Sequence, residues 1–266
     1  MHRVMALVRA RALTAASYRV QMSLSVVSLL VGIVPLYFIT GALQPVMADT
    51  IRAEGGHYFG FVLVGTVAFY FLSAAVNLLP GEIGSDLRTG TLEAVLSTPT
   101  RLAELVSGMI GFGLLWTTLR ALIVLTVGWL LGVQVAWSQL PAAAVVIGLL
   151  ILAYLPFGLM GSASLIAFRT AGPLARGILF ASTLLGGIYY PTRVIPSWIQ
   201  DLSSLIPLTY GLQALRRILL EGASLVAVAE ELGILVVFVV VLMSGGALAL
   251  WLALRYARRA GTLAQY

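Results

Sequence analysis

The sequence predicts an all-α integral membrane protein with six transmembrane helices. Of its 266 residues, 60% are hydrophobic and only 10% are charged, whereas a soluble domain carries about 25% charged residues. Six apolar runs approach or exceed the roughly 20 residues that a helix needs to cross a bilayer. All 16 basic residues are Arg, and they flank the apolar runs instead of clustering with aromatic residues. This distribution is typical of a membrane protein and argues against nucleic-acid binding.

Residue types that the chain lacks exclude several kinds of site. It has no Cys, which rules out disulfides, zinc–thiolate sites, iron–sulfur clusters and cysteine nucleophiles. It has no Lys, so it cannot contain the Gly-Lys-Ser/Thr of a phosphate-binding P-loop. His2 and His57 are far apart in the sequence, and a histidine metal site is not expected. We therefore expect this chain to bind no cofactor and to bind no ATP through a P-loop.

The six predicted spans are apolar runs bounded by polar or helix-breaking residues. They cover residues 22–42, 59–79, 105–131, 140–168, 173–190 and 226–254. The fifth is short and contains Gly177, Gly186 and Gly187. The first begins late and is too long for a signal-peptide core, so we interpret it as a retained helix. Without an internal repeat or linker, residues 1–266 are predicted to form a single transmembrane domain.

Six spans place both termini on the same side of the membrane, and the Arg residues indicate which side. That side carries Arg3, Arg9, Arg11, Arg19, Arg88, Arg101, Arg169, Arg176, Arg255, Arg258 and Arg259. The other side carries only Arg52, Arg193, Arg216 and Arg217. Because positive loops stay inside, both termini are predicted to be cytoplasmic.

The N-terminal residues 1–21 are basic and partly apolar. Val4, Leu7 and Val8 recur at helical spacing, with Arg residues nearby. This pattern favours a helix that lies in the cytoplasmic interface with its Arg side chains near anionic lipid. An ordinary positively charged flank of the first span is the alternative.

The predicted loop after the second span, residues 80–101, has features of a short amphipathic helix. Thr91 can cap a helix, and Glu93 suits its first turn. Leu92, Val95 and Leu96 fall on one face, and Pro99 ends the pattern. The apolar face needs a partner, which can be lipid, this protein or another protein.

The segment between the fifth and sixth spans, residues 191–224, contains two further short helices by the same reasoning. Pro196 and Pro207 break it into parts. One part has an apolar face of Leu202, Leu205 and Ile206, and the other a face of Leu212, Leu215 and Leu219. Two helices that dip into the outer leaflet fit these patterns, provided that protein or water covers the break between them. A surface loop with two interfacial helices is the alternative.

Both segments resemble signatures of type 2 ABC exporter permeases. The cytoplasmic match is Gly90-Thr91-Leu92-Glu93, followed by Leu96, Thr98 and Pro99. The external match includes Tyr190-Pro191, Trp198, Ile206-Pro-Leu-Thr-Tyr210 and Arg216. With six spans, the resemblance covers nearly the whole chain.

This resemblance implies a function and a set of partners. Residues Gly90, Thr91, Leu92, Glu93, Leu96 and Pro99 would form or flank a coupling helix that docks on a separate ATPase subunit, which uses ATP and Mg. The external helices would be re-entrant. Two permease copies, identical or different, would meet through spans one and five. The expected location is a bacterial inner membrane, and the expected cargo is a drug, a lipid-like molecule or a lipid-linked polysaccharide.

Four residues are candidates for a translocation path: Arg120, Tyr70, Tyr190 and Tyr210. Arg120 lies within the third span, and a charge inside the membrane is a functional candidate by default. It can instead bond carbonyl groups or reach a lipid phosphate. The tyrosines can line a path for amphiphiles, or they can belong to the aromatic belts common to membrane proteins.

No Asp or Glu lies deep in a predicted span, and this bears on what could drive transport. Proton- or sodium-coupled carriers usually need such groups at mid-membrane. An exporter permease driven by a partner ATPase is therefore the leading hypothesis. An ATP-independent carrier or channel is the alternative, and a membrane-embedded enzyme is the third, for which no catalytic His or Asp is found in the spans.

Overall fold

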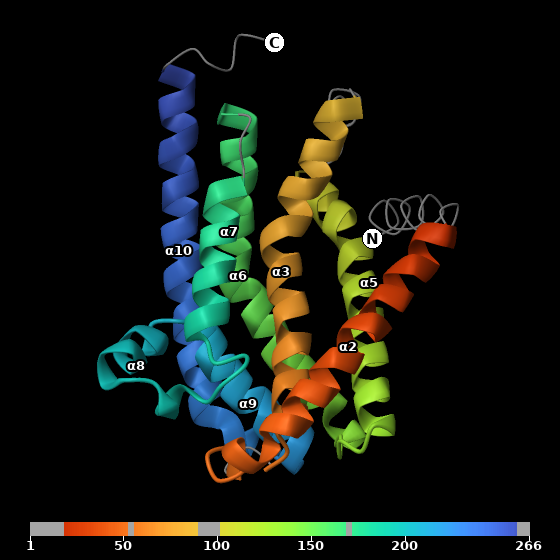
Figure 1. The fold of residues 1–266 in the computed structure, drawn as a ribbon. Helices are drawn as coiled ribbons and strands as arrows, with labels where there is room; N and C mark the ends of the chain where they lie inside the picture. Colours follow the sequence, from red (N-terminus) through yellow and green to blue (C-terminus); the bar gives the residue numbers. More distant parts are fainter. Residues whose placement is uncertain (1–18, 53–55, 90–101, 169–171, 260–266) are drawn as a thin grey trace.

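The computed structural model describes residues 19–52, 56–89, 102–168 and 172–259. They form long helices that run alternately up and down, with shorter helices between α6 and α10 (Figure 1). The long helices are α2 (Arg19–Met47), α3 (Tyr58–Thr89), α5 (Leu102–Leu130), α6 (Leu140–Phe168) and α10 (Ala229–Arg259). The shorter helices are α7 (Gly172–Leu185), α8 (Ser197–Ser204) and α9 (Pro207–Glu221), with 3-10 turns η2 (Trp137–Gln139), η3 (Thr192–Val194) and η4 (Val226–Val228).

Five of the described helices are long and apolar enough to cross a membrane. The candidate spans are Ser23–Met47, Tyr58–Ser85, Ile110–Leu130, Trp137–Leu165 and Val226–Leu248. Five of the six predicted spans correspond to these helices. The predicted range 140–168 coincides with α6, while the other helices extend beyond one or both of their predicted ends.

The fifth predicted span, 173–190, is not a full-length helix. Its helix α7 has 14 residues, about 21 Å at 1.5 Å per residue, against a hydrocarbon core of about 30 Å. The helix ends at Leu185 because Gly187 adopts a left-handed conformation with φ 79°, which is a common helix stop. The chain then passes through η3, α8 and α9 to the end of the bundle at which α10 begins (Figure 1).

Helix α3 lies at the centre of the bundle, in contact with α2, α5, α6, α7 and α9. The prediction that a loop begins at Pro80 was wrong, because the helix continues to Thr89. Pro80 is buried against α6, where a side chain at Gly161 would meet the proline ring at 3.3 Å. Spanning helices tolerate proline when neighbouring helices cover the freed backbone groups. The packing of Pro80 against α6 thus overrides the tendency of proline to end a helix.

Helix α9 is buried, which contradicts the interpretation of this segment as a surface loop. Leu212, Leu215 and Leu219 form the predicted apolar face, with at most 1% of each residue exposed. The helix packs against α3, α6 and α10. It begins with Pro207 at its first position and ends before Gly222, which is left-handed. Both prolines break the segment as predicted, since Pro196 caps α8.

Helix α8 differs from α9 in that its apolar side chains point away from the bundle. Trp198 and Leu202, together with Leu205 just beyond the helix, are exposed, and Ser203 is its only buried residue. The predicted face of Leu202, Leu205 and Ile206 therefore does not pack on the rest of the chain as a unit. These side chains are available to lipid.

Two predicted segments fall largely outside the described residues. Residues 1–18 of the interfacial helix are not described, and residues 19–21, predicted to belong to it, form the start of α2. Residues 90–101 are also not described. The coupling-helix residues Gly90, Thr91, Leu92, Glu93, Leu96 and Pro99 therefore stay a prediction.

Candidate functional site

One face of α3 carries polar side chains through the middle of the bundle. Thr66, Tyr70, Ser73 and Asn77 are separated by four, three and four residues, which places them in one stripe along the helix. Most of their neighbours on α3 are buried, but Asn77 is exposed and the other three are half-buried. We call these four residues the α3 polar face. Inside a membrane, such a face needs water, protein or a polar ligand beside it.

The polar face makes its hydrogen bonds within α3. The Thr66 hydroxyl donates to the carbonyl of Val62 at 2.9 Å. The Asn77 amide donates to the Ser73 carbonyl at 3.0 Å and to the Ser73 hydroxyl at 3.3 Å. Within the described chain, these side chains do not join α3 to another helix. Their remaining hydrogen-bond donors and acceptors are available to water or to another polar molecule.

Arg120 of α5 lies beside this face. It sits midway along the candidate span 110–130 and is half-buried. Its guanidinium lies 5.3 Å from the centre of the Trp116 ring, a favourable cation–π contact. Its buried Nε has no hydrogen-bond partner in the described part of the chain. The Tyr70 phenol is within electrostatic range of the guanidinium, so the fold brings together two of the four predicted candidates.

The other two candidates make contacts elsewhere. The Tyr190 hydroxyl donates to the carbonyl of Leu184 and closes the turn after α7. Burial raises the pKa of the Tyr190 phenol, so it stays a neutral donor over a wider pH range. The Tyr210 ring lies 5.9 Å from that of Phe238 in α10. Tyr210 thus packs α9 against α10.

Arg216 is a structurally central residue that the sequence analysis placed among the external charges. Only 4% of it is exposed. Its guanidinium donates to the carbonyls of Gly187 at 2.8 Å, Ile188 at 3.2 Å and Phe61 at 3.3 Å. It also lies 3.3 Å from the centre of the Phe61 ring. Its position next to Leu215 and four residues after Leu212, on the apolar stripe of α9, is the signal that could have revealed its burial.

The Arg216 contacts fix the turn after α7 against α3. The turn approaches α3 closely, because a side chain at Gly65 would meet the Ile188 carbonyl at 2.7 Å. The Tyr58 hydroxyl, at the start of α3, donates to the Tyr189 carbonyl at 2.7 Å. The turn after α7 is therefore held against the first part of α3.

The comparisons with known proteins concern this same part of the chain. Residues 48–220 match the family model described as ABC-2 type transporter. The matched stretch contains the α3 polar face, Arg120 and Arg216. The chain belongs to the ABC-2 type transporter family. Its predicted resemblance to type 2 ABC permeases is therefore confirmed.

A curated relative agrees with the family. This ABC-2 transporter chain is 26% identical over 207 residues to the linearmycin resistance permease protein LnrN of Bacillus subtilis (strain 168). The alignment covers 76% of this chain and 50% of that protein. The chain thus spans about half the length of the curated relative it matches.

Family membership and the five apolar helices together define the class of the protein. The ABC-2 transporter chain is a multi-pass membrane protein of a transporter family. The α3 polar face and Arg120 present hydroxyl, amide and guanidinium groups within the described spans.

Proposed function

We propose that the chain is the transmembrane subunit of an ATP-driven exporter that moves an amphiphile out of the cytoplasm or the inner leaflet. The observation that carries this proposal is the α3 polar face beside Arg120. A helix that presents hydroxyl and amide groups and a neighbouring cation inside an apolar bundle offers a route for a polar headgroup. The surrounding apolar side chains suit the rest of an amphiphile. The name of the relative favours a drug-like cargo over a lipid-like molecule or a lipid-linked polysaccharide.

The energy source in this proposal is a separate ATPase subunit, as the family implies. The carboxylates within the described spans are Glu82, Glu230 and Glu231, all near span ends. Glu231 is held by Arg217 at 2.6 Å. The described chain therefore offers no titratable acid at mid-membrane for ion coupling. In this proposal, Gly90, Thr91, Leu92, Glu93, Leu96 and Pro99 connect the ATPase to the spans.

A second permease copy, identical or similar, completes the route in this proposal. The α3 polar face is partly open in the single chain, and a facing copy would enclose it. ATP-driven movement of the paired subunits would then expose the route to alternate sides of the membrane. Both termini would be cytoplasmic, in the inner membrane of a bacterium.

The test is co-purification with the candidate ATPase, followed by measurement of ATP hydrolysis in lipid. Glu93→Arg reverses one charge in the proposed coupling helix, and we expect loss of the complex or of permease-dependent hydrolysis. Asp201→Arg is the matched control, because it makes the same charge change on exposed α8. The control variant should behave as the unmodified chain does.

Two results would contradict the proposal. One is a chain that never associates with the ATPase yet transports linearmycin in vesicles without ATP. The other is an equal loss of hydrolysis in Glu93→Arg and Asp201→Arg. The first result would favour the carrier or channel hypothesis, and the second would remove the special role of the 90–101 segment.

A further inference from the structure

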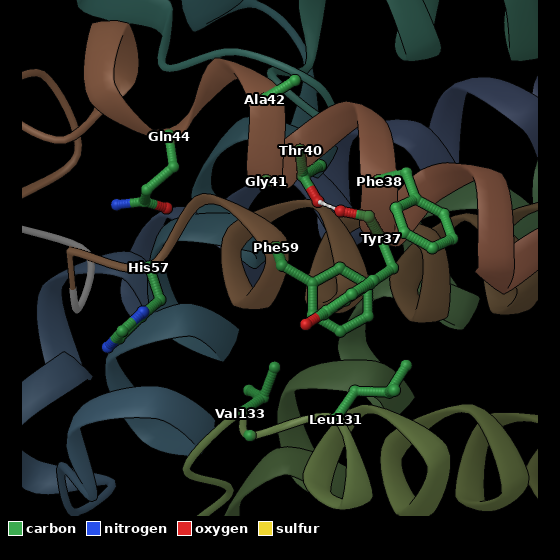
Figure 2. Close-up of a pocket in the computed structure, with 11 residues that line it drawn as sticks. Tyr37, Phe38, Thr40, Gly41, Ala42, Gln44, His57, Phe59, Leu131 and Val133 are labelled. Atoms are coloured by element: carbon green, nitrogen blue, oxygen red, sulfur yellow. Dashed lines mark hydrogen bonds between the residues drawn. The ribbon is translucent and has the colours of Figure 1, made fainter.

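A cavity of about 610 Å³ lies at the end of the bundle where α2 meets α3. The second half of α2, the start of α3 and the residues that follow α5 line it, as Figure 2 shows. None of the α3 polar face residues lines this cavity. Its volume falls within the roughly 300–1,000 Å³ typical of small-molecule sites.

Aromatic side chains build one part of the cavity. The rings of Tyr37 and Phe59 meet edge to face with centres 5.2 Å apart, and Phe38 follows at 5.6 Å from Tyr37. Leu131 and Val133 close the opposite wall in Figure 2. Edge-to-face contacts hold rings in defined orientations, so this apolar wall is preformed.

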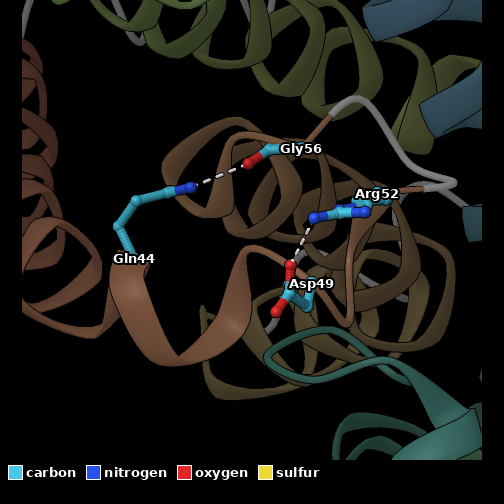
Figure 3. Close-up of polar contacts among 4 residues, drawn as sticks. All are labelled: Gln44, Asp49, Arg52 and Gly56. Atoms are coloured by element: carbon cyan, nitrogen blue, oxygen red, sulfur yellow. Dashed lines mark hydrogen bonds and ion pairs between the residues drawn. The ribbon is translucent and has the colours of Figure 1, made fainter.

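Gln44 fixes the other part of the cavity by joining α2 to α3. Its amide nitrogen donates to the Gly56 carbonyl at 2.7 Å, and its amide oxygen accepts from the Tyr58 backbone N–H at 2.7 Å. Figure 3 shows the first of these bonds beside the surface ion pair of Arg52 and Asp49. The clamp satisfies both groups of the amide and holds exposed His57 at the cavity rim.

The polarity of the lining changes along α2. Tyr37 and Phe38 lie within the candidate span of α2, whereas Gln44 is near its end and His57 directly precedes the span of α3. The part of the apolar wall formed by Tyr37 and Phe38 therefore lies farther from the span ends than the polar groups do. Phe59, Leu131 and Val133 lie at or just beyond span ends, near the level of the polar groups. A bilayer lipid has the same gradient, with its chain inward and its headgroup outward.

We propose that this cavity binds one amphiphile at the membrane interface, with its apolar chain against Tyr37, Phe38 and Phe59 and its polar head near His57. The ligand has one polar head and one apolar chain, a chemistry that the bilayer or the exported amphiphile can supply. This inference goes beyond the proposed exporter function and requires only that the chain lies in a membrane.

Two glycines of α2 provide a matched pair of variants. A side chain added at Gly41, which lines the cavity, would meet no atom within 4 Å. The same is true of Gly32, which lies on the same helix outside the cavity. Gly41→Leu therefore fills the site without a clash at its Cβ, and Gly32→Leu makes an equal change elsewhere. Gly41→Met, with a more flexible side chain, serves if Gly41→Leu does not fold.

The experiment uses the purified chain, without ATPase or ATP, in vesicles of phosphatidylethanolamine and phosphatidylglycerol. A diazirine-bearing phosphatidylglycerol is activated by light, and labelled peptides are mapped by mass spectrometry. We expect labels on residues 37–44 and 131–133, reduced about tenfold in Gly41→Leu because filling the site removes at least that factor in affinity. Labelling in Gly32→Leu should equal that of the unmodified chain.

Uniform labelling along α2, or labelling that Gly41→Leu and Gly41→Met leave unchanged, would overturn the proposal. Excess linearmycin distinguishes the two sources of the ligand. Competition with the label would show that cargo shares the site, and no competition would assign the site to bilayer lipid. Because no step uses ATP, a failure here is independent of a failure of the exporter proposal.

Discussion

Arg216 shows how backbone carbonyls and an aromatic ring can stabilise a cation inside this protein. A buried charge costs several kcal/mol, so it persists only with compensating contacts. Here three carbonyls and the Phe61 ring surround the guanidinium. The planar guanidinium, with five N–H donors, can bond several carbonyls at once, which the compact ammonium of Lys cannot do in the same geometry.

Replacing Arg216 is therefore expected to destabilise the fold. Arg216→Met should lower the free energy of unfolding by on the order of 3 kcal/mol, because it leaves buried carbonyls without donors. Thermal unfolding in detergent would measure this as a loss of several degrees. Arg52→Met is the control, since Arg52 forms an ion pair whose side chains are 80% and 84% exposed, and such pairs contribute little. Equal stability of the two variants would contradict the structural role of Arg216.

Arg120 differs from Arg216, because its contacts in the described chain leave the Nε of its guanidinium without a hydrogen-bond partner. Arg120→Gln removes the charge and should preserve folding while reducing transport. The measurement is resistance to a drug of the proposed cargo class in a sensitive bacterium that expresses the chain with the candidate ATPase, with membrane levels checked by immunoblot. Arg120→Lys, which retains the charge, should keep more resistance than Arg120→Gln. Full resistance in Arg120→Gln at normal membrane levels would exclude a role in the route.

Among the described helices, α6 approaches the backbone of α3 closely at Gly158. A side chain at Gly158 of α6 would meet the Ala75 carbonyl of α3 at 2.5 Å, closer than real contacts allow. Gly148, on the same helix, has open space around it. Small residues of this kind let spanning helices pack backbone to backbone.

This difference predicts opposite effects for the same substitution at two positions of α6. Gly158→Ala should lower the melting temperature in detergent, because α3 and α6 must separate. Gly148→Ala should leave it unchanged or raise it, since alanine favours helix by up to about 1 kcal/mol over glycine. A melting temperature that falls equally in both variants would show that Gly158 has no special contact.

The helices also show what the sequence could predict and what it could not. Apolar run length predicted α6 at its true bounds, because hydropathy alone sets such a span. The same criterion overestimated the length of the fifth span, since Gly187 ends α7 through its left-handed backbone conformation. It ended α3 at Pro80, because the packing of that ring on Gly161 depends on a helix far along the chain. The burial of Arg216 was not predicted for a similar reason, as its carbonyl partners come from distant segments.

For the whole molecule, the informative surface is the apolar one that this single chain leaves uncovered. Val31 on α2, Phe180 on α7 and Val240 on α10 are 64%, 70% and 63% exposed. Lipid can cover such surfaces, and so can a second copy. The proposed pairing through spans one and five places α2 and α7 at the contact and leaves α10 facing lipid.

The absence of cysteine makes this arrangement directly testable. Single variants Val31→Cys, Phe180→Cys and Val240→Cys would each be oxidised in native membranes with copper phenanthroline. We expect disulfide-linked dimers for at least one of the first two variants and none for Val240→Cys, because only α2 and α7 would lie near their symmetry mates. Efficient dimers through Val240→Cys alone would place the contact on α10.

The buried position of Arg216 also constrains how the protein is made. Its partner Phe61 precedes it by 155 residues, so a ribosome must synthesise most of the chain before the two can meet. During that interval the Phe61 carbonyl and the surface of α3 that α9 will cover must wait in the translocon or in lipid. Final assembly of the early helices therefore depends on the arrival of α9, and a nascent chain that stops short of it is the natural substrate for membrane quality control.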